Sequence, residues 1–232
     1  MYGDRLIVYK FGGTVLLEED KIVKMINDGL KEHKKIVVVV SALGRMHSPY
    51  STDTLYSLCE YASSKEIARL VSCGEIISSV MVSNMLKKNN VNATSLSVYE
   101  MNLVYDNGFM MNDYLSLCLN QFDVVIVPGF LGLKGNEIIL LPRGGSNITA
   151  SFLASYFKSE LVIFTDVDGI YLSDPKEDIN AKKMEYLTYN DLKEITKNNH
   201  KLFPLEGIKY LEEANVKVLI RNLDNFSGTL IN

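Results

Sequence analysis

The chain has 232 residues, of which 47% are hydrophobic and 22% are charged, so it is long enough to fold around one large core or two small ones. Its net charge of -4 comes from acidic and basic residues mixed along the sequence, which leaves no basic stripe for a nucleic-acid backbone. The longest apolar runs are far shorter than the ~20 residues of a membrane-spanning helix, and Cys59, Cys73 and Cys118 form neither a CxxC pair nor a disulfide framework.

The N-terminus carries charge within its first five residues and then changes to a strand pattern. It therefore lacks the basic start and long apolar centre of a secretion signal. We expect a cytoplasmic protein with neither a membrane nor nucleic acid as a partner. Binding of anionic small molecules stays open, because local cations and backbone amides bind phosphate even in a weakly acidic protein.

Short apolar runs predict strands, which in chain order cover residues 6–9, 36–42, 91–98, 124–128, 137–141, 161–165 and 216–220. Helical spacing of apolar residues predicts helices between them, over residues 18–33, 75–88, 146–158 and 208–214. Since most strands are apolar throughout and alternate with helices, we predict an α/β fold, a three-layer αβα sandwich with a mostly parallel central sheet. The sequence has no repeat and no Pro/Ser-rich linker, which favours one domain over residues 1–232.

The first predicted strand runs into KFGGT, in which Lys10 precedes a pair of glycines. Gly12 and Gly13 allow the backbone to approach a phosphate closely, and Lys10 adds positive charge. The order differs from that of a Walker A loop, where the lysine follows the glycines. On the local pattern alone, a plain Gly-Gly turn explains these residues as well as a phosphate site does.

Residues 140–150, LLPRGGSNITA, repeat this arrangement, with Arg143 before two glycines and Ser146 as the expected cap of the next helix. Two glycine loops that each carry a cation indicate an anion site more strongly than one does. A further helix start is predicted at residues 51–53. Glu75 is expected at the start of another helix, where a carboxylate normally interacts with the helix dipole.

Residues 165–176, TDVDGIYLSDPK, follow a predicted strand and carry three aspartates. Such a loop suits a nucleotide ribose or a magnesium region, although DG and DP are also common turn dipeptides. His47 and His200 have no partners at catalytic spacing and are interpreted as surface residues. No Ser/His/Asp arrangement is evident in the sequence.

Taken in order, KFGGT, VVSALG with TDTL, SCGEIIS, PGF, RGGSNITA and TDVDGIYLSDP resemble the aspartokinases of the amino acid kinase family over essentially the whole chain. Residues 44–58 and the C-terminal IRNLDNFSGTL are especially similar to the bacterial diaminopimelate-regulated type. The resemblance implies an ATP-dependent kinase of amino-acid and lysine biosynthesis that phosphorylates the side-chain carboxylate of L-aspartate and pairs as a homodimer. Because the chain ends at Asn232, where the family's regulatory ACT domains begin, we expect none here.

The resemblance also implies the roles of individual residues. Glu75 would bind the acceptor's ammonium and Arg143 its carboxylate, and Lys10 and Arg143 would be catalytic. The residues implied for the nucleotide are Lys10, Gly12, Gly13, Thr165, Asp166, Tyr171, Asp174 and Lys176. The residues implied for the acidic amino acid are Thr14, Ser41, Thr52, Glu75, Arg143 and Asn147. Magnesium would accompany the ATP, and no protein ligand is assigned to it.

The acceptor loop departs from the family pattern, which reads two threonines, one further residue and GRGGSD. The differing positions are Ile139, Leu140, Pro142 and Asn147. Asn147 lacks the charge of aspartate, a difference of roughly 1 kcal/mol in a hydrogen bond. Pro142 lacks the N–H of glycine, and if that N–H donates to the transferring phosphate its loss costs ~3 kcal/mol.

Elsewhere, Val15 replaces the usual serine, Lys176 replaces the usual arginine, and His200 with Lys201 stands where the family has a lysine. Three hypotheses therefore stay open. The first is an aspartokinase without regulatory domains. The second is a related enzyme with a different carboxylate, carbamate or phosphate acceptor, and the third is a nucleotide-binding paralogue with little or no catalysis.

Overall fold

The computed structural model describes residues 6–171, 181–198, 203–225 and 227–232. Eight of the described strands form the central sheet: β1 (Leu6–Phe11), β2 (Lys35–Val40), β3 (Ala93–Ser95), β6 (Val124–Pro128), β9 (Leu161–Phe164), β12 (Tyr186–Leu187), β13 (Val218–Arg221) and β14 (Thr229–Ile231). Their order is β12-β14-β13-β9-β1-β2-β6-β3, and only β13 and β14 pair antiparallel. The predicted mostly parallel sheet is thus confirmed.

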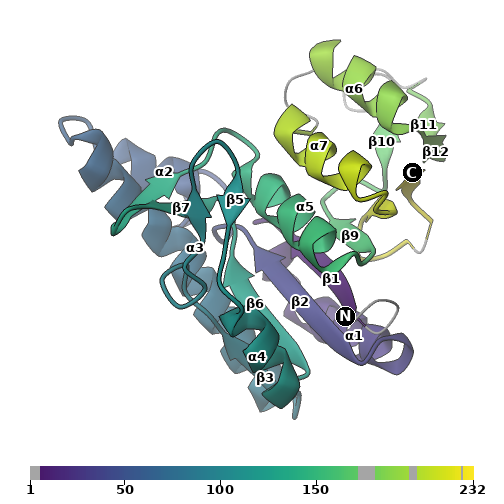
Figure 1. The fold of residues 1–232 in the computed structure, drawn as a ribbon, viewed down its shortest axis with the longest axis horizontal. Coiled ribbons are helices and arrows are strands. Elements are labelled where there is room, and N and C mark those ends of the chain that lie inside the picture. The colour runs from purple at the N-terminus through teal and green to yellow at the C-terminus, as the bar shows by residue number, and fades with distance from the viewer. Residues whose placement is uncertain (1–5, 172–180, 199–202, 226) are drawn as a thin grey trace.

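The described helices are α1 (Glu19–Glu32), α2 (Thr52–Ser57), α3 (Ser64–Lys88), α4 (Tyr114–Gln121), α5 (Gly145–Phe157), α6 (Tyr189–Asn198) and α7 (Leu205–Glu213), with a 3-10 turn at Val15–Leu17. Figure 1 shows α4 and α5 in front of the sheet and α1 and α3 behind it. No helix among the described residues is both long and apolar enough to cross a membrane.

Two hydrophobic clusters lie on the two faces of the sheet. Along β2, Val37 and Val39 belong to the cluster with α4 and α5, whereas Ile36, Val38 and Val40 belong to the cluster with α1 and α3. Successive side chains of a strand point to opposite faces, so a strand covered on both faces is apolar throughout. This packing explains the continuous apolar runs of the sequence and confirms the three-layer prediction.

A smaller sheet contains β5 (Phe109–Met110), β4 (Val104–Tyr105), β7 (Leu131–Lys134) and β8 (Glu137–Leu140), in that order. The strand predicted at residues 137–141 therefore exists, but it pairs antiparallel with β7 and lies outside the central sheet. The tight β7–β8 turn explains this pairing, because it contains Gly135 with φ of 60°. A further two-stranded sheet pairs β10 (Ile170–Tyr171) with β11 (Lys183–Met184).

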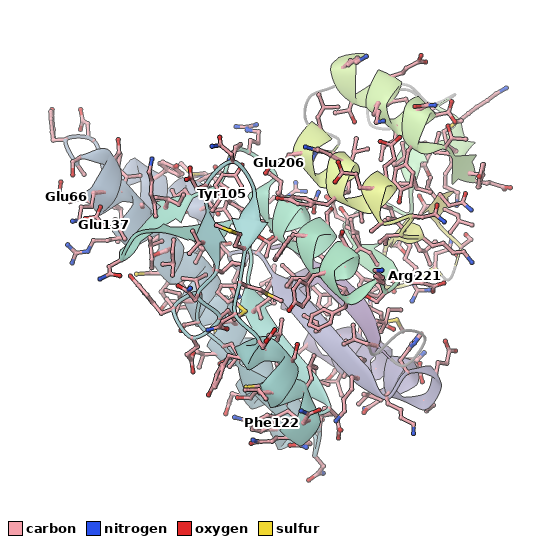
Figure 2. The ribbon with its side chains drawn as sticks, in the orientation of Figure 1. Glu66, Tyr105, Phe122, Glu137, Glu206 and Arg221 are labelled. Carbon is pink, nitrogen blue, oxygen red and sulfur yellow. The ribbon has the colours of Figure 1, made fainter. Side chains whose placement is uncertain are left out.

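The small sheet is attached to α7 by polar contacts. Tyr105 Oη donates to Glu206 Oε2 at 2.6 Å, and Figure 2 shows these two side chains side by side. Tyr210 Oη accepts from the backbone N–H of Phe109 at 2.8 Å. These contacts join β4 and β5 of the small sheet to α7.

The helix predicted at residues 75–88 is longer than expected and begins at Ser64. Ser63 is its N-cap in a capping box, in which Ser63 Oγ accepts from Glu66 N and Glu66 Oε2 accepts from Ser63 N at 2.9 Å. The prediction that Glu75 starts this helix is therefore wrong. The strand predicted at residues 91–98 is also shorter than expected, covering Ala93–Ser95.

Candidate active site

The first glycine loop lies between the ends of the two strands that flank β1. Gly12 N donates to Phe164 O at 3.0 Å on the β9 side, and Gly44 N donates to Gly13 O at 2.8 Å on the β2 side. A Cβ on Gly13 would lie 2.3 Å from Ala42 O, so this position requires glycine. In a parallel α/β sheet, ligands bind at this carboxyl edge of the strands.

Lys10 is buried at the end of β1, with 9% of its surface exposed. A Cβ on Gly12 would lie 3.9 Å from Lys10 Nζ, which places the ammonium beside the glycine loop. Burial lowers the pKa of Lys10 to about 8. The described residues supply no carboxylate within ion-pair distance of it. A buried cation without a protein counter-charge favours an anionic ligand here.

A pocket of about 900 Å³ includes Ser41, whose N–H donates to Phe11 O at the end of β1. Four of the six residues predicted for the acceptor line it: Ser41, Thr52, Glu75 and Arg143. They come from four separate segments, which are the end of β2, the start of α2, the middle of α3 and the loop before α5. The fold thus brings together residues that are more than 100 positions apart in sequence.

Glu75 is almost completely buried, with 1% of its surface exposed. Its Oε1 accepts from Ala42 N at 3.2 Å and from Thr52 Oγ1 at 3.5 Å, whereas its Oε2 is buried and has no hydrogen-bond partner among the described residues. Burial raises the pKa of Glu75 to about 7. Because Glu75 lies inside α3, it is not the helix-dipole partner that the sequence suggested. Glu75 thus contributes a buried carboxylate to the pocket wall, with one oxygen that has no donor among the described residues.

The second glycine loop follows β8 of the small sheet and ends at the N-terminus of α5. Gly144, with φ of 79°, is the N-cap of α5 and provides no side-chain cap. The prediction that Ser146 caps the helix is wrong, because Ser146 Oγ accepts a hydrogen bond from Ser41 Oγ at 3.0 Å instead. Gly144 and Gly145 line the pocket, so the start of α5 faces it beside the exposed Arg143. A helix N-terminus with an arginine beside it favours a carboxylate or phosphate ligand.

Three predicted residues lie in a separate pocket of about 230 Å³ beside the glycine loop, namely Thr14, Thr165 and Asp166. Thr14 thus lies with the residues expected for the nucleotide rather than with those expected for the acceptor. Tyr171 Oη donates to Asp168 Oδ1 at 2.6 Å. Asn147 does not line the large pocket, and its Oδ1 is buried without a partner in the described part of the chain.

The remaining predicted residues, Asp174 and Lys176, lie outside the described residues, as do His200 and Lys201. The three cysteines are free thiols, of which Cys59 and Cys118 are buried and Cys73 is exposed.

Sequence reasoning missed several residues of the large pocket, including Asp53, Tyr56 and Phe130. Thr52 and Tyr56 are four positions apart on α2, a spacing that places them on one helix face and could have indicated Tyr56. Phe130 adopts a left-handed conformation with φ of 66°, and a Cβ on Gly145 would lie 2.6 Å from its ring. No local pattern in the sequence predicts this contact.

The family model described as "Amino acid kinase family" matches residues 5–222. Aspartokinase 1 of Bacillus subtilis (strain 168) is 34% identical, over 98% of this chain and 60% of its own length. An aspartate kinase structure from Synechocystis has a TM-score of 0.84 at 28% identity and covers 97% of this chain and 40% of that one. E. coli aspartokinase III, in complex with aspartate and ADP, has a TM-score of 0.83 at 21% identity, over 97% of this chain and 64% of that one. The chain therefore spans about 60% of the length of the Bacillus relative.

Proposed function

The chain belongs to the amino acid kinase family, and we propose that it transfers the γ-phosphoryl group of ATP to the side-chain carboxylate of L-aspartate, giving 4-phospho-L-aspartate. The observation that carries the proposal is the large pocket, which is lined by the exposed Arg143 and by the buried Glu75, a carboxylate with one unpaired oxygen among the described residues. The similarity to Aspartokinase 1 of Bacillus subtilis supports aspartate as the acceptor.

In this proposal the Glu75 carboxylate accepts a hydrogen bond from the α-ammonium of aspartate. Arg143 binds the α-carboxylate of aspartate through bidentate hydrogen bonds. A second cation is then available at the other end of the site, where Lys10 and the N–H of Gly13 hold the phosphates. Gly12 shapes this loop, because its own N–H donates to Phe164 O. Ser41 and Thr52, which line the large pocket, are assigned to the acceptor end. Asn147 is assigned there by the resemblance alone, because it lies outside the pocket lining. Thr165, Asp166 and Tyr171 are assigned to the nucleotide, and Thr14 lies beside them.

The transfer forms one bond and breaks one. A side-chain carboxylate oxygen of aspartate attacks the γ-phosphorus, and the bond from that phosphorus to the β–γ bridging oxygen breaks. ADP leaves with the electron pair of that bond, and no proton has to move because the attacking carboxylate is already ionised. The chain's contribution is to align the reactants and neutralise charge, which agrees with a site made of cations and backbone amides.

Magnesium is implied by the reaction class. Among the described residues no group of three or more His, Cys, Asp or Glu side chains is arranged to hold a metal ion. We therefore propose that Mg²⁺ is held by the ATP phosphates, whose negative charge it neutralises, and assign no step to a protein-bound metal.

A second candidate acceptor class is favoured by one observation, the altered acceptor loop. Pro142 lines the large pocket in place of the glycine of the resemblance, and Asn147 Oδ1 is buried without a partner in the described structure. A different carboxylate, a carbamate or a phosphate could therefore be the acceptor. A nucleotide-binding paralogue with little catalysis is the third hypothesis and differs from both in its lack of turnover.

A coupled assay for ADP release tests these candidates with L-aspartate, L-glutamate, N-acetyl-L-glutamate, carbamate and a nucleoside monophosphate. Turnover with L-aspartate above the no-acceptor rate supports the proposal. Turnover with another acceptor alone contradicts it in favour of the second candidate, and ATP binding without any turnover favours the third. The homodimer stays a prediction that a measurement of molecular mass in solution would test. The cytoplasmic location and the single domain without ACT regions also stay predictions, and cell fractionation and sequencing of the gene would test them.

A further inference from the structure

An ion pair joins two residues from opposite sides of the first glycine loop. Arg45 Nη2 contacts Asp166 Oδ2, although the two residues are 121 positions apart in sequence. Arg45 directly follows Gly44, whose N–H donates to Gly13 O at 2.8 Å. Asp166 lies beyond the other side of the loop, in the small pocket that also contains Thr14.

The register of the sheet shows why the pair crosses the loop. Phe11, the last residue of β1, pairs with Val40 of β2 on one side and with Phe164 of β9 on the other. Figure 1 shows β1 between these two strands. Arg45 extends the β2 side and Asp166 the β9 side, so their contact spans the turn at Gly12 and Gly13. Arg45 thus adds a second cation to the loop that already holds Lys10.

The exposure of this ion pair allows Arg45 to leave Asp166 for another anion. The Arg45 side chain is 62% exposed and that of Asp166 is 39% exposed, and ion pairs this open to water contribute little to stability. Asp166 keeps another contact if Arg45 leaves, because Thr165 Oγ1 donates to Asp166 Oδ1 at 3.2 Å. A guanidinium has the fork geometry that binds two oxygens of a phosphate at once.

The place of Arg45 in the chain favours contact with one phosphate group of ATP, the γ-phosphate. Arg45 lies between Ser41 and Thr52 in the chain, and both of these residues line the large pocket proposed for the acceptor. The loop that carries Arg45 therefore connects the glycine loop, which Gly44 contacts, to the wall of the large pocket. In a transfer to that acceptor, the γ-phosphoryl group is the part of ATP that must face this side.

We propose that Arg45 is a phosphate-binding residue that exchanges Asp166 for oxygens of the ATP γ-phosphate when the nucleotide binds. This inference rests on the proposed kinase function. It makes Arg45 a residue that distinguishes ATP from ADP, because ADP lacks the group that Arg45 contacts. The other interpretation is a fixed bridge that only holds the two loops together, in which case both nucleotides are affected equally.

The test is the dissociation constant of ATP and of ADP, measured by calorimetry without any acceptor, for wild type, Arg45→Ala, Arg45→Lys and Arg69→Ala. Arg69 is an exposed arginine on α3 and is the matched control. We expect Arg45→Ala to weaken ATP binding by roughly tenfold or more and ADP binding by about twofold or less, since hydrogen bonds to charged groups have the larger effect. The ATP affinity of Arg45→Lys should lie between those of wild type and Arg45→Ala, because lysine keeps the charge but cannot bind two phosphate oxygens at once.

An equal loss for both nucleotides in Arg45→Ala, or a loss no larger than that of Arg69→Ala, overturns the inference and leaves the kinase proposal intact. A wild-type protein that binds neither nucleotide overturns both. Thermal unfolding of each variant checks that folding is unchanged, and a lower melting temperature together with equal losses identifies the fixed bridge.

Discussion

The carboxylate of Glu75 accepts a hydrogen bond from the backbone N–H of Ala42 at 3.2 Å, which links the middle of α3 to the loop after β2. This contact uses Oε1 and leaves Oε2 buried without a partner among the described residues. Glu75→Gln keeps the shape and the Oε1 acceptor but removes the charge. We expect the KM for aspartate to rise by roughly 10- to 100-fold, as for loss of a hydrogen bond to a charged group, with little change in ATP binding.

The control for this variant is Ser79→Ala on the same helix, because Ser79 Oγ donates to Ile76 O within α3 and does not line the large pocket. Steady-state kinetics with varied aspartate and varied ATP separate the two effects. A rise in the KM for ATP as large as that for aspartate would contradict the ammonium role of Glu75.

Glu75 also makes the stability of the free protein depend on pH. Burial raises its pKa from 4.5 to about 7, so the folded protein holds the proton more tightly than the unfolded chain does. The resulting stabilisation is complete below about pH 4.5 and is lost as the pH rises through about 7. Relative to Glu75→Gln, the wild type should lose on the order of 3 kcal/mol of unfolding free energy between about pH 5 and about pH 8. Urea unfolding of both proteins at the two pH values measures this, and parallel pH profiles would contradict it.

Lys10 should make ATP affinity depend on pH in the alkaline range. Burial lowers its pKa to about 8 in the free protein, so the ammonium is charged below that pH and neutral above it. If only the charged form holds the phosphates, ATP binding weakens about tenfold between pH 7 and pH 9. Lys10→Met should bind ATP weakly at both pH values and lose this dependence. Calorimetric titration of both proteins provides the measurement, and a wild-type affinity that is constant over this range argues against the phosphate role.

Most of the central sheet could be predicted because its signal is local. Each of β1, β2, β6 and β9 is buried on both faces and therefore reads as an apolar run, whatever its neighbours are. The start of α3 had a local signal too, in Ser63 and Glu66, which the prediction overlooked by beginning the helix at Glu75.

The site could be predicted only in part, because its contacts join distant segments. Lys10 and the glycine loop follow a strand directly, whereas the Ser41–Ser146 hydrogen bond and the Arg45–Asp166 ion pair each connect loops more than 100 residues apart. No spacing in the sequence encodes such pairs. Of the small sheet, only the strand at β8 was predicted, because β4 and β5 are two residues long and have no periodicity to detect.

Restoring the family residues in the acceptor loop should change turnover with aspartate. Pro142→Gly returns a backbone N–H at the pocket, and if that N–H donates to the transferring phosphate, kcat rises by up to about a hundredfold. Asn147→Asp places a carboxylate where Oδ1 is buried and unpartnered in the described structure, which should cost about 1–3 kcal/mol of stability in the free protein. Measuring kcat/KM and melting temperature for each single and the double variant separates the two positions. Unchanged aspartate turnover in the double variant would mean that these positions do not limit the reaction.

The two glycines of the first loop should respond differently to alanine. A Cβ on Gly13 would lie 2.3 Å from Ala42 O and 2.8 Å from Gly44 O, and both of these are backbone atoms of the adjoining loop, which cannot move as freely as a side chain. A Cβ on Gly12 would meet nothing nearer than Phe164 O at 3.5 Å, which is ordinary contact. Gly13→Ala should therefore lose roughly 2–3 kcal/mol of stability and lower the melting temperature by about 5–10 °C.

Gly12→Ala is the matched control, because it adds the same methyl group to the same loop. Its melting temperature should stay close to that of the wild type. Equal losses in the two variants would mean that the cost comes from restricting the loop backbone in general rather than from the close approach of Gly13 to the loop after β2. Since that approach also brings Arg45 to the glycine loop, Gly13→Ala should weaken ATP binding more than Gly12→Ala does, which the same calorimetric titration measures.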